Sequence, residues 1–77
     1  MTVYAIYDTV AQESGPLFEA KNDGIALRNF ENFLGKTHLV DDFRLYAVGE
    51  YDKESMVLVG YEKARLVRLG ARMQDGE

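Results

Sequence analysis

Tyrosines and basic residues are the side chains of this sequence whose types and spacing could do chemistry, and that chemistry is the binding of nucleic acid. Tyr4 and Tyr46, with Tyr61 as a third candidate, could stack on bases, since stacking stabilises single-strand complexes by about 1–3 kcal/mol per base. Cations could hold the phosphates; the candidates are Arg44, Lys63, Arg65, Arg68 and Arg72. Alternatively, the aromatic residues simply fill strands and core, as their β-propensity predicts.

The stretch 63–72 contains four basic residues and no acid. A helix there would bring Arg65, Arg68 and Arg72 to one face, whereas a strand would point Arg65 away from Arg68. Three interpretations follow: a phosphate track, a solvated edge strand, or a contact with the acidic loop of a neighbouring subunit. The formal net charge of −4 argues against a non-specific binder of duplex DNA, whose surface is usually basic.

The sequence lacks the groupings that enzymes and metal sites use. It has no cysteine and one histidine, His38, so thiol catalysis and Cys- or His-based metal clusters are excluded. The acids between 41 and 54 do not follow the ligand spacing of a calcium loop, which includes a glycine at a fixed position, and nothing marks one of them as a general acid or base. We therefore expect no enzyme, no catalytic residue, no metal and no cofactor.

The elements that must position these residues belong to one small domain. We assign residues 1–73 to it and expect a disordered tail at 74–77. A core of this size contributes only about 3–5 kcal/mol, and there is no disulfide to add to it, so we expect a homo-oligomer. The longest apolar run, 56–59, is too short to span a bilayer, and the N-terminus does not resemble a signal peptide. We expect a cytoplasmic protein.

A helix is predicted at 23–34. Its N-cap is Asn22 or Asp23, and Gly35 fits a left-handed C-terminal position. The apolar residues follow helical spacing on one face: Ala26, Leu27, Phe30, Phe33 and Leu34. Arg28 lies beside that face, where it could contact a ligand or a subunit, or form an i, i+3 pair with Glu31.

Strands are predicted at 2–8, 17–20, 43–50 and 56–59, with turns at 12–16 and 60–62. The stretch 64–69 is either a further strand or a short helix. The fold class is α+β, a small antiparallel sheet of four to five strands with one helix packed on a face, in the order ββαβββ. One helix cannot cover both faces, and we expect Tyr4, Ile6, Tyr46 and Val48 to share the open one.

Four stretches resemble, in the same order, the small nonstructural protein of gokushovirus-type microviruses, which are single-stranded DNA phages. They are VYAIYD at 3–8, GPLF at 15–18, NDGIALRNF at 22–30 and DFRLYAVGEYD at 42–52. The chain departs from the family pattern at Leu17, which interrupts a Pro-Phe pair, and in a shorter loop before Asp42. The resemblance implies a replication accessory protein in contact with single-stranded DNA or replication proteins, and it assigns no catalytic residue.

From these observations we predict an accessory protein of phage single-stranded DNA replication, which binds single-stranded DNA as a homo-oligomer. Its binding residues would be Tyr4, Arg28, Arg44, Tyr46, Lys63, Arg65, Arg68 and Arg72. The alternative is a protein-interaction module that regulates a phage or host replication protein through a sheet edge or face, without binding nucleic acid.

Overall fold

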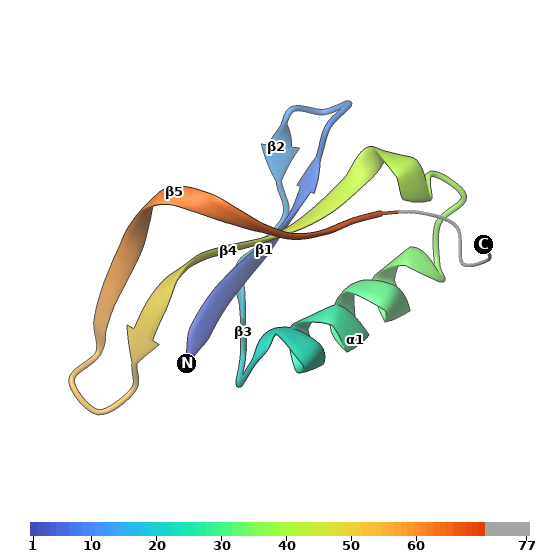
Figure 1. Cartoon of the computed structure of the whole chain (residues 1–77). Coiled ribbons are helices and arrows are strands. Elements are labelled where there is room, and N and C mark those ends of the chain that lie inside the picture. Colours follow the sequence, from blue (N-terminus) through green and yellow to red (C-terminus); the bar gives the residue numbers. More distant parts are fainter. Residues whose placement is uncertain (71–77) are drawn as a thin grey trace.

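The computed structural model describes residues 1–70 and contains one antiparallel sheet with one helix on it (Figure 1). The elements are β1 (Thr2–Asp8), β2 (Glu13–Ser14), β3 (Phe18–Ala20), α1 (Asp23–Leu34), the 3₁₀ turn η1 (Val40–Asp42), β4 (Phe43–Asp52) and β5 (Val57–Leu69). The predicted α+β class, with four to five strands and one helix, is confirmed. Arg72 and the tail 74–77 lie outside the described residues.

The predicted order ββαβββ is wrong, because three strands precede the helix and two follow it. The turn expected at 12–16 contains the two-residue strand β2. The turn expected at 60–62 does not form, and the two segments around it are one strand, β5. Gly60 pairs with Gly49 and Arg65 with Ala47, so the four residues 61–64 of β5 correspond to the single residue Val48 of β4. These extra residues bulge the strand instead of reversing it.

The strands are ordered β2-β1-β4-β5, and β3 also pairs with β1. β1 is therefore flanked by β4 on one side and by both short strands on the other. β4 lies between β1 and β5 and pairs with both of them; residues 44–47, 49 and 50 are paired on both sides. β5 is an edge strand, with no partner on its outer side among the described residues.

The helix begins and ends where its sequence predicts. Asn22 is the N-cap, because its side-chain oxygen accepts a hydrogen bond from the backbone N–H of Ile25 at 3.0 Å. Gly35 follows the last helical residue, but its φ of −65° is right-handed, so the predicted left-handed position is wrong. The last turn tightens instead, as Lys36 N–H donates to the carbonyl of Phe33.

The core lies between α1 and one side of the sheet, which we call the helix side. Its fully buried members with the largest side chains are Tyr4, Phe30 and Leu45. Smaller residues let helix and sheet approach each other: Ala20, Ala26 and Ala47. At the far end of this side, Phe33 of α1 and Phe43 of β4 pack edge to face at 4.9 Å.

The prediction that Tyr4, Ile6, Tyr46 and Val48 share a face is wrong. β1 and β4 pair with Tyr4 opposite Ala47 and Ala5 opposite Tyr46, and directly opposed residues lie on the same side of a sheet. Tyr4 and Ile6 therefore lie on the helix side, whereas Tyr46 and Val48 lie on the other. We call this second side the open face, because no described element covers it.

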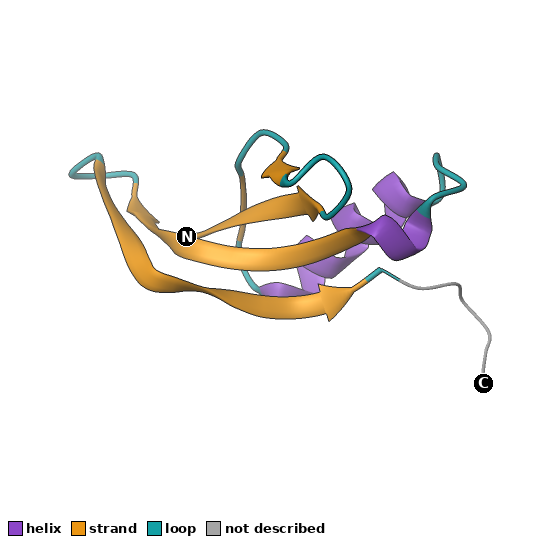
Figure 2. Ribbon diagram, turned by 90° about the horizontal axis from the view of Figure 1, so that it is seen from above, coloured by secondary structure: helices purple, strands orange, loops and turns teal. Residues whose placement is uncertain are grey.

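The hairpin of β4 and β5 extends beyond the helix. Figures 1 and 2 both place its loop at one end of the molecule, away from α1. The protein measures 42 × 24 × 19 Å along its principal axes. We call residues 49–60 the wing; β1 pairs with it only at Gly49 and Glu50, and no helix lies against either face (Figures 1 and 2).

Candidate nucleic-acid interface

A shallow hollow occupies the open face of the sheet. It is lined mainly by apolar and aromatic side chains from β1, β4 and β5, with contributions from β2 and the loop after it: Ala5, Tyr7, Ser14, Leu17, Tyr46, Val48, Lys63 and Ala64. Leu17 at its rim is 55% exposed. Monomeric soluble proteins seldom leave such a surface uncovered without a use for it.

Two tyrosines form the centre of this open-face hollow. Tyr7 of β1 and Tyr46 of β4 meet edge to face, with ring centroids 6.3 Å apart and an interplanar angle of 89°. Both are half-buried, so each ring is held by its neighbours but keeps part of its surface accessible. An aromatic ring in this position can stack on a base of any sequence.

Two cations accompany the tyrosines. Arg44 is opposite Tyr7 in the β1–β4 pairing and therefore lies on the same face, while Lys63 lines the hollow itself. Both are exposed, and within residues 1–70 neither forms an ion pair. Their charges are thus available to an anionic ligand.

Arg65 and Arg68 lie on the helix side, contrary to the expectation that a strand would separate them. β5 pairs Arg65 with Ala47 and Arg68 with Leu45, because a bulge adds one residue between them. Arg65 binds Asp23, and Arg68 lies 4.0 Å from Glu31, both on α1. Their role in the structure is to join the edge strand to the helix, which differs from the predicted phosphate track.

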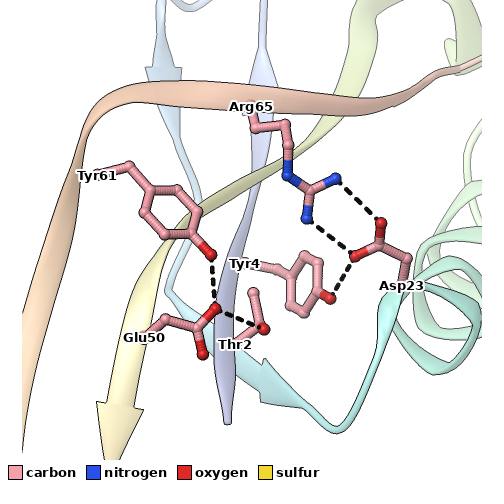
Figure 3. Close-up of polar contacts among 6 residues, drawn as sticks. All are labelled: Thr2, Tyr4, Asp23, Glu50, Tyr61 and Arg65. Atoms are coloured by element: carbon pink, nitrogen blue, oxygen red, sulfur yellow. Dashed lines mark hydrogen bonds and ion pairs between the residues drawn. The ribbon is translucent and has the colours of Figure 1, made fainter.

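Tyr4 is unable to stack on a base, so its predicted role is corrected. It is fully buried, since β1 and β4 pair so that its ring lies under the helix, 5.8 Å from Phe18. Its hydroxyl donates to Asp23 at 2.6 Å (Figure 3). Burial and this carboxylate together raise the pKa of Tyr4 to about 12, because both disfavour the phenolate.

Asp23 is the junction of this polar cluster. Its carboxylate accepts one hydrogen bond from the Tyr4 hydroxyl and two from the Arg65 guanidinium, the latter at 3.0 and 3.2 Å. The Arg65 bonds, and then that of Tyr4, lower the pKa of Asp23, since they favour its charged form. A negative charge in the first turn of α1 also complements the helix dipole.

A second carboxylate is held next to it. Glu50 accepts hydrogen bonds from Tyr61 at 2.5 Å and from Thr2 at 2.9 Å (Figure 3). These bonds lower the pKa of Glu50, and the carboxylate raises the pKa of Tyr61. Tyr61, the third stacking candidate, therefore lies on the helix side and serves the contact between β4 and β5.

The remaining predicted residues are spread over the molecule. Arg28 is exposed on α1, in the layer opposite the open face, and forms no ion pair with Glu31. Arg72 is not described. Sequence reasoning missed Tyr7, although Tyr7 alternates with Tyr4 and Ile6, and this alternation is the signal that it faces the other side.

Neither a metal cluster nor a membrane span emerges from residues 1–70. No group of three or more histidine or acidic side chains there is arranged to hold an ion. Within the same residues, no helix is both long enough and apolar enough to cross a bilayer.

Comparison with known proteins identifies one family. The family model described as Phage ORF5 protein matches residues 1–73. No curated protein and no solved structure matches the chain.

Proposed function

The chain belongs to the Phage ORF5 protein family, and on this premise we propose that it binds single-stranded DNA on the open face of its sheet. In this proposal it acts as a homo-oligomeric accessory protein of phage DNA replication in the host cytoplasm. The replication context comes from the resemblance to the nonstructural protein of gokushovirus-type microviruses. The binding itself is argued from the open face.

The observation that carries the proposal is the distribution of charge between the two sides of the sheet. On the helix side, Arg65 and Arg68 face carboxylates on α1. On the open face, Arg44 and Lys63 have no acidic partner within the described residues, and they flank the Tyr7–Tyr46 pair. Unpaired cations around accessible aromatic rings fit a ligand with both phosphates and bases.

The acidic balance of the whole chain is compatible with this site. Screening confines the field of an exposed charge to about 8–10 Å at physiological salt, so acids at other places on the surface act weakly at the hollow. They would, however, reduce long-range attraction to duplex DNA. We therefore expect modest affinity and a preference for single strands, whose unstacked bases can reach Tyr7 and Tyr46.

The second candidate function is a protein-interaction module, and the exposed edge strand favours it. Val57, Leu58 and Val59 of β5 are each more than half exposed. A partner strand could add to this edge by main-chain hydrogen bonding. In this case no nucleic acid would be bound.

Fluorescence anisotropy distinguishes the two candidates. A labelled single-stranded oligonucleotide is titrated with the protein at low and at physiological salt, and a duplex of the same length is the control. The proposal predicts binding to the single strand that weakens as salt rises, because counterions are released from the phosphates, and weaker binding to the duplex. Absence of binding at low salt would refute the proposal and favour the interaction module.

A further inference from the structure

The wing carries a run of exposed apolar residues that the described part of the chain does not cover. Met56, Val57, Leu58 and Val59 are 75, 51, 57 and 59% exposed. Runs of this kind are rare on a soluble surface unless they form an interface. Figures 1 and 2 show that the wing projects away from α1, so the helix cannot cover it.

The run lies on a regular stretch of edge strand. Residues 57–60 pair one to one with 49–52, without a bulge. Their outer side has no partner among the described residues. An apolar edge of this kind is a template for another strand.

The charges along β5 indicate which strand that is. Residues 56–61 contain no charged side chain, whereas 62–69 contain Glu62, Lys63, Arg65 and Arg68. When a strand pairs with its own copy around a two-fold axis, the residue at the axis meets itself, so a charge there would meet a like charge. The neutral stretch 56–61 can therefore face itself with no charge at or next to the axis.

We propose that two copies of the chain join by antiparallel pairing of their β5 strands at residues 57–59, with Leu58 opposite Leu58 of the second copy. Among the possible registers, this one pairs Val57 with Val59 and Leu58 with itself, so that all three apolar residues meet apolar partners. With Val57 at the axis, Val59 would lie opposite Ser55. With Val59 at the axis, Val57 would lie opposite Tyr61.

This dimer deepens the self-association that is part of the proposed function, but it does not depend on DNA binding. The two-fold axis is perpendicular to the sheet, so both open faces lie on the same side. Tyr51 and Leu58 are opposed in the β4–β5 pairing, and their row would continue across the axis. Two hollows would then lie on one extended sheet.

Cysteine cross-linking tests the register directly, because the chain has no cysteine of its own. Directly opposed residues in an antiparallel pair have Cα atoms about 4.5–5.5 Å apart, which is within the range of a disulfide. Leu58→Cys should form a disulfide-linked dimer under mild oxidation. Leu69→Cys, on the same strand and of similar exposure, is the control and should remain mostly monomeric. Equal cross-linking of the two variants would overturn the proposed register.

Charge exchange at the same position tests the two-fold axis. Leu58→Lys and Leu58→Glu should each sediment as folded monomers, because like charges would meet at the axis, and an equimolar mixture should recover the dimer. A wild-type monomer at all concentrations, or variants that both remain dimeric, would overturn the proposal. Titration with a short single-stranded oligonucleotide distinguishes the dimer from the proposed function. If Leu58→Lys binds the oligonucleotide, DNA binding does not require the dimer. If the wild type fails to bind it, the proposed function is refuted, and the dimer proposal is unaffected.

Discussion

Arg65 on the edge strand donates two hydrogen bonds to Asp23 in the first turn of the helix, across 42 residues of sequence. The same carboxylate accepts the hydroxyl of the buried Tyr4. One aspartate of α1 thus forms hydrogen bonds with both β1, through Tyr4, and the edge strand β5, through Arg65. Because this pair occupies Arg65 and Arg68 lies close to Glu31, the cations of the sheet strands β4 and β5 that have no acidic partner among residues 1–70 are Arg44 and Lys63, on the open face.

Replacing Asp23 should destabilise the domain more than replacing Arg65. Asp23→Ala leaves the hydroxyl of Tyr4 buried without a partner, which costs about 1–3 kcal/mol. Arg65→Ala removes a half-exposed ion pair, which contributes less than about 1 kcal/mol. Urea denaturation measures both. In a Tyr4→Phe background the cost of Asp23→Ala should decrease; an unchanged cost would show that the Tyr4–Asp23 bond does not stabilise the fold.

The free energy of unfolding should decrease at alkaline pH. The pKa of Tyr4 is about 12 in the folded protein, compared with about 10 in an unfolded chain. The stabilisation is therefore fully present below about pH 10, and it is lost as pH rises from about 10 to 12, by up to about 1.4 kcal/mol per pH unit. Denaturant unfolding at several pH values measures this, and Tyr4→Phe should have a shallower slope. Equal slopes would contradict the assignment to Tyr4.

Two paired glycines should respond differently to alanine. A Cβ on Gly49 would lie 2.6 Å from the carbonyl oxygen of Val59, whereas a Cβ on Gly60 would lie 3.9 Å from that of Val48. Gly49→Ala must therefore shift backbone at the bulge, at a cost of about 1–3 kcal/mol, while Gly60→Ala should be nearly neutral. Thermal unfolding followed by circular dichroism compares them. A similar loss in both variants would contradict the close approach of the strands.

Tyr46→Leu should weaken single-strand binding. A base stacked on the ring contributes about 1–3 kcal/mol, so the dissociation constant should rise severalfold or more, and the domain should stay folded because the ring is only half-buried. Tyr61→Leu is the matched control, since this ring lies on the helix side. Titration of the same oligonucleotide measures both. An equal effect of the two variants would remove the open face from the proposal.

Local signals predicted the elements well. The helix at 23–34 follows from its apolar spacing and from the N-cap Asn22, whose side chain accepts a hydrogen bond from Ile25, only three residues away. The strands at 2–8 and from 43 onward follow from their composition. The failures concern long-range relationships. Alternation divides each strand into two sets, but it does not tell which set of β1 meets which set of β4, and Tyr4 was placed on the wrong side for that reason.

Bulges explain the other differences between sequence and structure. The extra residues at 61–64 let one strand continue through a predicted turn, and the bulge near Val67 brings Arg65 and Arg68 to the same side. Such irregularities depend on the packing of the neighbouring strand and helix. Arg44, Tyr46 and Lys63 were nevertheless identified from the sequence, and they lie together with Tyr7, which was missed.

The proposal that single-stranded DNA binds on the open face is tested most directly by comparing two double charge reversals. Arg44→Glu with Lys63→Glu changes the open face, and Arg28→Glu with Lys36→Glu applies the same change in net charge to exposed residues of α1 and its C-terminal end. Anisotropy of a labelled single strand is measured at several salt concentrations. We predict that the first variant loses most of its binding, with a salt dependence shallower by about 0.7 per lost phosphate contact, and that the second binds nearly as the wild type does. Equal losses in both variants, or none in the first, would contradict an interface on the open face.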